Sequence, residues 1–285
     1  GVLNILHGLG AEVGQALTEH DGVQGISFTG GTVTGRKVAA TAAPRFKKLS
    51  LELGGKNPTI VFDDADLNLA VPGAVAAACA NQGEICLCGS RLFVQRGIYD
   101  RFMEHFLEAV AARTVGDPAA PGTVVGALVS EAHRAKVESY LALATEEGGT
   151  ILRGGERPAL PAPFDGGFFL EPAVVTGLAP SCRTATEEIF GPVVTVHPFD
   201  TEDEVVAHAN GTRYGLAGSV WTTNLGRAHR VAQRLHTGMV WVNCWLLRDL
   251  RVPFGGVKES GVGHEGGRWS LDFYSEAMNI CVKHG

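Results

Sequence analysis

Residues 23–43 read VQGISFTGGTVTGRKVAATAA, a short apolar run followed by two adjacent glycines and a stretch with helical spacing. The apolar run 23–28 predicts a strand, the glycines predict a tight turn, and residues 33–43 predict a helix with small and apolar faces. Strand, turn and helix in this order make half of a βαβ unit, from which parallel sheets are built.

The same alternation continues along the rest of the chain. Alternating or apolar runs predict further strands over 49–53, 59–62, 150–152, 218–222 and 239–245. Helical spacing predicts helices over 66–80, 99–113, 131–147, 202–209, 225–235 and 269–274, and the Pro- and Gly-rich segment 158–167 predicts a surface loop. Strands that alternate with helices of this length predict an α/β fold with a mainly parallel sheet covered on both faces.

Composition limits the classes of function. The 285 residues are 45% hydrophobic and 19% charged, and 24 basic against 30 acidic residues give a net charge of −6 without long runs of one sign. We therefore expect no nucleic-acid partner. The longest apolar stretch, 71–80, is far shorter than the roughly 20 residues of a spanning helix, so we expect no membrane partner. Six cysteines are too few for a disulfide scaffold, which favours a reducing compartment, the cytoplasm.

Glycines at the first turn suggest an anion site. Gly30 and Gly35 are separated by four residues, and the free N–H groups at the start of the following helix can hold a phosphate. The spacing is not that of the usual dinucleotide motif, so a plain tight turn at Gly30 is the alternative. The sequence Gly54-Gly55-Lys56 lacks the frame of a phosphate-binding P-loop, which we reject.

Two cysteines lie in a polar, glycine-flanked turn, residues 81–91, NQGEICLCGSR. A thiol in such a loop is a candidate nucleophile, because nearby backbone N–H groups favour the thiolate. The alternative is that Cys86 and Cys88 are small buried apolar residues. No second pair of cysteine or histidine ligands has zinc-binding spacing, so no metal site is predicted.

A single carboxylate interrupts an apolar strand end at residues 51–58, LELGGKNP. Glu52 is costly to bury unless it is used or paired. It is either a general base with a raised pKa or the partner of an ion pair with Lys48 or Lys56, and the sequence does not choose between them.

Five motifs in order resemble the aldehyde dehydrogenase superfamily nearly end to end: FTG at 28–30, LELGGKN at 51–57, QGEICLCGSR at 82–91, EEIFGP at 187–192 and PFGG at 253–256. The resemblance implies a parallel-sheet catalytic domain, an incomplete Rossmann-like cofactor domain and a C-terminal oligomerisation strand over 277–283. It implies boundaries at 1–54 for the tail of the cofactor domain, 55–259 for the catalytic domain, and 260–285 for the return helix and oligomerisation strand.

The resemblance also implies the roles of individual residues. Cys86 would attack the aldehyde to give a thiohemiacetal and then a thioester, Cys88 would be a structural neighbour, and Glu52 would activate the hydrolytic water. The cofactor would be NAD, with NADP not excluded, held by Gly30, Gly31 (where the family more usually has Ser), Gly35, Leu53, Glu188 and Phe190. Without the resemblance, Glu188 is a solvated acid and Phe190 an ordinary core residue.

A finer resemblance concerns the substrate. GEICLC at 83–88 and VNCWLLR at 242–248 are similar to the branch that oxidises 2-aminomuconate or 2-hydroxymuconate semialdehyde. That substrate class carries a distal carboxylate, which Arg248 would bind bidentately. The alternatives are that Arg248 pairs with Asp249 and that Arg251 is the carboxylate ligand. Another substrate, retinal or a further apolar aldehyde, would instead contact Trp245, Leu246 and Leu247.

The chain starts at Gly1, and by resemblance roughly the first two fifths of the family's chain would precede it, including an Asn that binds the oxyanion. We therefore expect a truncated chain whose full-length form is a homo-oligomer, a dimer or tetramer, acting on a small-molecule aldehyde. A different class of function is also open: a non-catalytic remnant that serves only as an oligomerisation partner.

Overall fold

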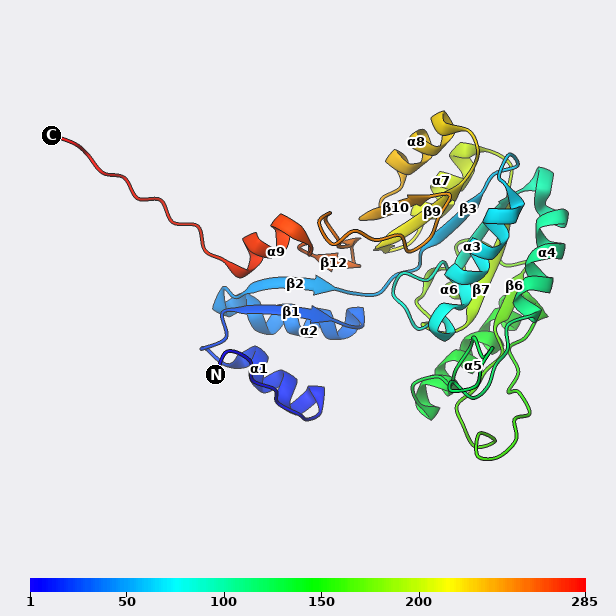
Figure 1. The fold of residues 1–285 in the computed structure, drawn as a ribbon, viewed down its shortest axis with the longest axis horizontal. Coiled ribbons are helices and arrows are strands. Elements are labelled where there is room, and N and C mark those ends of the chain that lie inside the picture. The colour runs from blue at the N-terminus through cyan, green and yellow to red at the C-terminus, as the bar shows by residue number, and fades with distance from the viewer.

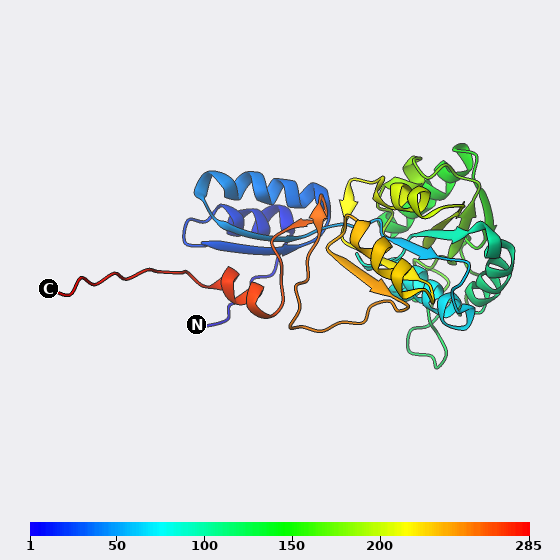
Figure 2. The same cartoon turned by 90° about the horizontal axis from the view of Figure 1, so that it is seen from above.

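The computed structural model describes residues 1–285, which form two lobes joined by residues 53–57 and by the segment that returns after residue 242 (Figure 1, Figure 2). Both views show the smaller lobe built on β1 and β2, with α1 and α2 packed beside them. The larger lobe holds a seven-stranded sheet between helices. The last residues run as an extended tail away from both lobes.

The smaller lobe begins with the predicted strand, turn and helix. β1 (Gly25–Thr29) is followed by α2 (Thr32–Ala42) and by β2 (Lys48–Glu52), which is parallel to β1 with Thr29 opposite Glu52. β12 (Gly261–Val262) returns from the far end of the chain and pairs antiparallel with β2. The other elements of this lobe are α1 (Gln15–Glu19), a π-helical turn (Gly10–Gly14), a 3-10 turn (Ala43–Arg45) and α9 (Gly267–Tyr274).

The larger lobe is built on the sheet β10-β9-β3-β4-β7-β6-β5. Every neighbouring pair is parallel except β5 with β6. The strands are β3 (Pro58–Val61), β4 (Arg91–Gln95), β5 (Thr150–Arg153), β6 (Ala173–Thr176), β7 (Val193–Phe199), β9 (Ala217–Trp221) and β10 (Met239–Val242). A separate ribbon pairs β8 (Tyr214–Gly215) with β11 (Val257–Lys258).

Successive side chains of a strand point to opposite faces of the sheet, so apolar residues on both faces need a covering layer. Helices provide that layer on both sides of this sheet. Val61 and Leu92 pack on the face covered by α3 (Leu67–Cys79) and α4 (Tyr99–Ala111). Ile60 and Phe93 pack on the opposite face, under α7 (Glu202–Asn210) and α8 (Leu225–Arg234). The remaining helices are α5 (Glu131–Glu146), α6 (Arg183–Thr186) and 3-10 turns at Ala80–Gly83 and Arg96–Ile98. The predicted parallel α/β fold is confirmed.

The amino ends of β3, β4 and β7 lie at the same edge of the sheet. Pro58 is opposite Arg91, and Arg91 is opposite Thr195. The loops that enter these three strands, 53–57, 80–90 and 187–192, therefore converge. The carboxyl end of β2 leads directly into the first of them, so the smaller sheet meets the larger one at this edge.

Two expected strands differ from the structure of the single chain. Residues 275–285 have no regular structure, and Met278, Ile280 and Val282 are exposed. The oligomerisation strand expected over 277–283 needs a second subunit and stays a prediction. The strand predicted over 239–245 ends at Val242, since Asn243 takes a left-handed φ of 53°. Three strands of the larger sheet were not predicted, namely β4, β6 and β7, and neither were the two-residue strands β8, β11 and β12.

No helix is long and apolar enough to cross a membrane.

Arg91 is a fully buried cation that joins the loop before β3 to the carboxyl end of α7. Its guanidinium donates to the carbonyl oxygens of Lys56 (2.8 Å), His208 (2.8 Å) and Ala209 (2.7 Å), the last two near the carboxyl end of α7. These carbonyls lie where a helix leaves acceptors unpaired and favours a positive charge.

Arg91→Ala should leave all three carbonyls without this donor and lower the free energy of unfolding by at least about 3 kcal/mol. Urea unfolding followed by circular dichroism measures this. Arg96→Ala is the matched control, because Arg96 forms an exposed ion pair with Asp200 and its loss should change stability little. Equal urea midpoints for the two variants would contradict the structural role of Arg91.

Candidate active site

A cavity of about 400 Å³ lies where the three entering loops meet the glycine turn of the smaller lobe. Its lining combines a thiol, two carboxylates, an aromatic ring and backbone from three glycines. The lining residues are Thr29, Gly30, Gly31, Gly54, Glu84, Ile85, Cys86, Glu188 and Phe190. Five of the residues singled out in the sequence therefore line one cavity: Gly30, Gly31, Cys86, Glu188 and Phe190.

The backbone between α3 and β4 makes a sharp turn that presents Cys86. Asn81 and Gln82 have φ of 48° and 46°, and Gly83 has φ of 75°. A Cβ on Gly83 would lie 2.2 Å from the carbonyl oxygen of Gly191, so only glycine fits where this loop passes the 187–192 loop.

The side chain of Asn57 holds the cysteine loop from the other side. Its Nδ2 donates to the carbonyl oxygens of Cys86 (2.7 Å) and Cys88 (2.9 Å), and its Oδ1 accepts from the N–H of Ala217 (3.0 Å). Because the buried Asn57 amide forms these three hydrogen bonds, it fixes the cysteine loop relative to β3 and β9. Asn57 lies within a quoted motif, but no sequence signal assigned it this task.

The environment of Cys86 disfavours its thiolate. Burial, followed by the negative charges of Glu188 and Glu52, raises the pKa of the Cys86 thiol to about 11, against smaller opposing effects of its own backbone N–H and of Arg248. At neutral pH Cys86 is therefore a thiol that needs a base to become a nucleophile. Cys88 is 6% exposed, and burial raises its pKa to about 12, so its position agrees with a structural neighbour.

Glu52 is a buried carboxylate without hydrogen bonds. It ends β2 and is 4% exposed, and neither of its side-chain oxygens has a partner. Burial and then the charge of Glu265 raise its pKa to about 8, while Arg248 lowers it. The alternative ion pairs are absent: Lys48 binds Glu276 at 2.8 Å, and Nζ of Lys56 has no partner. A carboxyl group with a pKa near neutrality is suited to general-base chemistry.

Glu188 and Phe190 line the 400 Å³ cavity from the 187–192 loop. Oε1 of Glu188 accepts from the N–H of Gly55 at 2.9 Å, and burial raises its pKa while Lys136 and Lys56 oppose the rise. Glu188 is thus tied to the neighbouring loop and is not a solvated acid. Phe190 takes a left-handed φ of 61° and is partly exposed to the cavity.

The glycines of the turn have two different positions: Gly30 and Gly31 line the cavity, and Gly35 packs against Leu53. Gly31 is the N-cap of α2 and has no side-chain cap, so the first N–H groups of the helix are left without such an acceptor. Gly35 and Leu53 do not line the cavity. A Cβ on Gly35 would lie 2.4 Å from Cδ2 of Leu53, so this glycine allows α2 to pack closely on β2.

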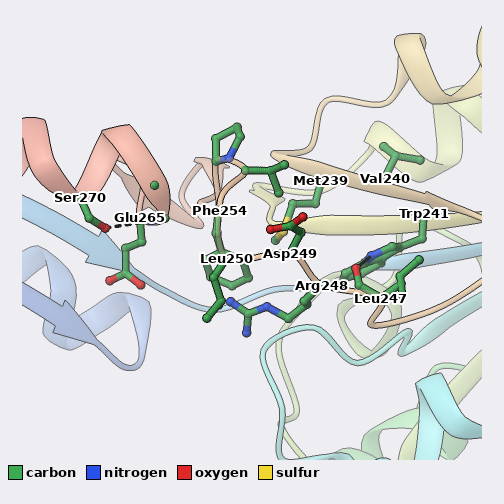
Figure 3. Close-up of a pocket in the computed structure, with 14 residues that line it drawn as sticks. Met239, Val240, Trp241, Leu247, Arg248, Asp249, Leu250, Phe254, Glu265 and Ser270 are labelled. Atoms are coloured by element: carbon green, nitrogen blue, oxygen red, sulfur yellow. Dashed lines mark hydrogen bonds between the residues drawn. The ribbon is translucent and has the colours of Figure 1, made fainter.

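Arg248 lies in a second cavity, of about 570 Å³, between α9 and β10 (Figure 3). Its guanidinium carbon is 4.2 Å from the ring centroid of Phe254, a cation–π contact. The alternative pair with Asp249 is absent, because the Asp249 carboxylate binds Arg251, with Nε–Oδ1 at 2.9 Å. In Figure 3 the side chains of Arg248 and Asp249 point in different directions.

Glu265 shares the second cavity and is a residue that the sequence interpretation missed. It lies in the glycine-crowded segment after Pro253, where no periodic pattern singles it out. Its charge is felt by Glu52, and its Oε1 accepts from Ser27 at 3.4 Å. Glu52 lines neither cavity, and Arg248 of the second cavity lowers the pKa of both Glu52 and Cys86.

Comparisons with known proteins agree with this geometry. The chain is 50% identical to 2-aminomuconic semialdehyde dehydrogenase of Mus musculus, covering 100% of this chain and 59% of the mouse protein. It is 48% identical to 2-hydroxymuconic semialdehyde dehydrogenase of Pseudomonas sp. (strain CF600), covering 99% of this chain and 58% of that protein. The chain thus spans about three fifths of the length of the curated relatives it matches.

Solved structures give the same result at the level of the fold. Betaine aldehyde dehydrogenase from Staphylococcus aureus in complex with NAD+ superposes with a TM-score of 0.91 at 43% identity, covering 94% of this chain and 53% of that chain. The profile of the aldehyde dehydrogenase family matches residues 1–280. With nearly its whole length matched in sequence and in structure, the chain belongs to the aldehyde dehydrogenase family.

Proposed function

We propose that this chain forms the catalytic part of an NAD+-dependent dehydrogenase that oxidises an aldehyde to a carboxylic acid through Cys86. The observation that carries the proposal is the 400 Å³ cavity, which Cys86 lines together with the glycine turn, Glu188 and Phe190. The names of the mouse and Pseudomonas relatives, both semialdehyde dehydrogenases, support the reaction class.

The cavity fits a nicotinamide dinucleotide. The uncapped start of α2 behind Gly30 and Gly31 suits the pyrophosphate, and a Cβ on Gly31 would meet nothing within 4 Å, which leaves room for a phosphate to approach. Glu188 is placed to accept hydrogen bonds from a ribose, and Phe190 to contact the nicotinamide ring. When bound, NAD+ supplies the hydride acceptor. These residues suit NADP equally.

Gly35 and Leu53 act on the cofactor indirectly. Their close contact sets the distance between α2 and β2, and hence the position of the turn that contains Gly30 and Gly31. A larger side chain at residue 35 would push α2 away from β2.

Cys86 attacks the aldehyde carbon after losing its proton. Glu52 is the base that we assign to this proton and later to the water that hydrolyses the thioester, because its carboxylate is buried, has no hydrogen bond and has a raised pKa. The backbone N–H of Cys86 contacts its own sulfur and is placed to stabilise the oxyanion of the adduct.

The substrate carries a carboxylate at its far end. Arg248 is exposed in the second cavity, and no acidic side chain binds it, because Arg251 holds Asp249. Phe254 supports the guanidinium from one face and leaves its edge free for a bidentate carboxylate. We therefore assign a semialdehyde of the 2-aminomuconate or 2-hydroxymuconate class as substrate. On this basis we assign the substrate carboxylate to Arg248 and not to Arg251, whose guanidinium binds Asp249.

A second substrate class has one observation in its favour. Trp245 and Leu246 pack in the same apolar cluster as Cys86, and Nε1 of Trp245 donates to the carbonyl oxygen of Leu87 at 3.1 Å. An apolar aldehyde such as retinal would use this wall. It would leave the charge of Arg248 without a function.

Domain roles and assembly follow the same proposal. Residues 1–54 contribute to cofactor binding, 55–259 carry the nucleophile, and 260–285 return to the smaller lobe and provide a strand for a second subunit. The exposed Met278, Ile280 and Val282 support such pairing, because they alternate along an extended segment that has no partner in the chain. We propose a homo-oligomer on this basis.

Cys86→Ala should abolish aldehyde oxidation, lowering NADH formation by at least about a thousandfold, because no other group can form the covalent adduct. NADH absorbance is measured with the 285-residue chain and with the longest natural form of the protein. Cys244→Ala is the control, since Cys244 does not line the 400 Å³ cavity. If neither wild-type form produces NADH with any aldehyde tested, the non-catalytic alternative gains support.

Glu52→Gln should allow one burst of NADH per active site and then stall, because the thioester is no longer hydrolysed. In the wild-type enzyme thioester hydrolysis should rise with pH and level off above about 8, since the base acts only when the Glu52 carboxyl group has lost its proton. Stopped-flow absorbance and intact-mass detection of the acyl-enzyme measure both effects. A rate of thioester hydrolysis that does not change between roughly pH 6.5 and 9 would argue against Glu52 as the base.

Arg248→Ala should raise KM about 10- to 100-fold for a semialdehyde with a distal carboxylate, the usual effect of losing a charge-assisted hydrogen bond. Steady-state kinetics with the charged substrate and with an uncharged aldehyde of similar length separate this from a general defect. Arg268→Ala is the matched control, because Arg268 is an exposed residue on α9 outside both cavities. Equal losses on both substrates would contradict the role of Arg248.

A further inference from the structure

The chain returns from the larger lobe to the smaller lobe at Glu259 and Ser260. β11 pairs with β8 beside the larger sheet, and β12 pairs with β2 of the smaller sheet. These two residues therefore separate a strand held by one lobe from a strand held by the other, and Figure 1 shows β12 beside β2 between the lobes. Side chains at this crossing are placed to contact both lobes at once.

Ser260 links this crossing to the first one, residues 53–57. It is fully buried, its carbonyl oxygen accepts from the N–H of Leu53 at 2.9 Å, and its Oγ donates to the carbonyl oxygen of Gly54 at 2.7 Å. The same Oγ accepts from the N–H of Gly215 in β8 at 2.9 Å. The two crossings therefore form one hinge, and a change in the angle between the lobes has to move both.

Glu259 places one carboxylate between cations of the two lobes. Its Oε1 lies 2.8 Å from a terminal guanidinium nitrogen of Arg36 on α2, and its Oε2 lies 3.4 Å from Nε of Arg213, which precedes β8. Neither arginine forms an ion pair with another acid. Oε2 is buried and accepts no hydrogen bond, so the charge of Arg213 is what compensates it within the chain. We call this arrangement the Arg36–Glu259–Arg213 bridge.

The bridge acts on the helix that follows the glycine turn. α2 begins at Thr32, whose Oγ1 donates to the carbonyl oxygen of Glu259 at 3.5 Å, and Arg36 lies one helical turn further on. The 400 Å³ cavity is lined by Gly30 and Gly31 from the smaller lobe and by Cys86 from the larger lobe. A shift of α2 relative to the larger lobe therefore changes the distance across this cavity.

The other end of the bridge lies near the same cavity. Burial raises the pKa of Glu188, and Arg213 is one of the cations that oppose this rise. Glu188 lines the 400 Å³ cavity on the side of the larger lobe. The bridge thus connects a helix of the smaller lobe to a cation that acts on a cavity residue of the larger lobe.

The exposure of the bridge decides what it does. The side chains of Arg36, Arg213 and Glu259 are 57%, 48% and 36% exposed, so the two ion pairs contribute little to global stability. Bending at a hinge breaks few other contacts, and a small free energy then changes the populations of the open and closed arrangements several-fold. The bridge is therefore weak for folding but sufficient to set the angle between the lobes.

We propose that Glu259 is a positioning residue whose carboxylate joins α2 to the larger lobe across the hinge, and so holds the glycine turn at the distance from Cys86 that the cofactor needs. Glu259 does not line the 400 Å³ cavity. This inference rests on the proposed function, in which the glycine turn binds the pyrophosphate and Cys86 attacks the aldehyde. Its consequence is that affinity for the cofactor depends on an ion pair outside the cavity.

Hydrogen–deuterium exchange in the 285-residue chain without cofactor tests the bridge itself. Glu259→Gln removes the charge and keeps the shape, and it should speed exchange in peptides that cover residues 49–57 at least about threefold, the effect of losing two partly exposed ion pairs. Peptides that cover β4 should not change. In about 1 M NaCl the wild type should exchange at the rate of the variant, because salt screens the pairs.

Glu202→Gln is the matched control. The Glu202 carboxylate also lies between two arginines, Arg227 at 3.4 Å and Arg230 at 2.8 Å, but all three residues belong to the larger lobe. This variant should leave exchange of residues 49–57 at the rate of the wild type, at low salt and at high salt.

Variants of the partners show whether Glu259 acts through the bridge. Arg36→Gln and Arg213→Gln should each speed exchange of residues 49–57, and Arg36→Gln combined with Glu259→Gln should exceed neither single variant. In the longest natural form of the protein, Glu259→Gln should raise KM for NAD+ at least about threefold and leave KM for the aldehyde within about 1.5-fold.

Exchange of residues 49–57 at the wild-type rate in Glu259→Gln would overturn the proposal, and so would an equal rise in β4. Additive effects of Arg36→Gln and Glu259→Gln would also contradict it, as would an unchanged KM for NAD+ together with faster exchange. Failure of the proposed function is a separate result. In that case the wild-type protein forms no NADH with any aldehyde, while the exchange experiment still reports whether the bridge holds the lobes.

Discussion

The side-chain amide of Asn57 joins three segments that are distant in sequence: the loop before β3, the cysteine loop before β4, and β9. It does so with three hydrogen bonds made inside the protein, to the carbonyl oxygens of Cys86 and Cys88 and from the N–H of Ala217. The site depends on this amide because the cysteine loop has a left-handed turn that no regular hydrogen-bond ladder supports. Arg91, at the start of β4, reinforces the same edge by binding the carbonyl oxygen of Lys56.

Charge at the site is organised by burial and not by ion pairing. Burial raises the pKa of Glu52 to about 8 and that of Cys86 to about 11, and it lowers the pKa of Lys56 to about 7. None of these three side chains forms an ion pair. A pair of neutralised charges would be stable but chemically inert, whereas an unpaired carboxylate with a pKa near neutrality can take and release a proton during a reaction. The stability lost by burying Glu52 without a partner is compensated elsewhere in the core.

The site lies at the amino ends of the strands of the larger sheet, although ligands in open parallel sheets usually bind at the carboxyl ends. The smaller lobe explains this placement. β1 and β2 end at the same level, with Thr29 opposite Glu52, and their carboxyl ends meet the amino ends of β3 and β4. The proposed cofactor turn thus follows the usual rule with respect to its own sheet, and the larger lobe delivers the thiol from the opposite side.

The sequence by itself determined the elements with strong periodicity and the motifs that identify the family. The helices near 66–80, 99–113 and 131–147 were predicted to within two residues at each end. β7 was missed because Pro192 precedes it and Pro198 lies within it, which obscures its strand pattern. Only the tertiary structure decided that Glu52 has no ion-pair partner, that Asp249 binds Arg251 and leaves Arg248 free, and that Asn57 ties the cysteine loop to β9. The physical reason is that pairing depends on which side chains are brought within a few ångströms by distant segments, and spacing along the chain does not encode that distance.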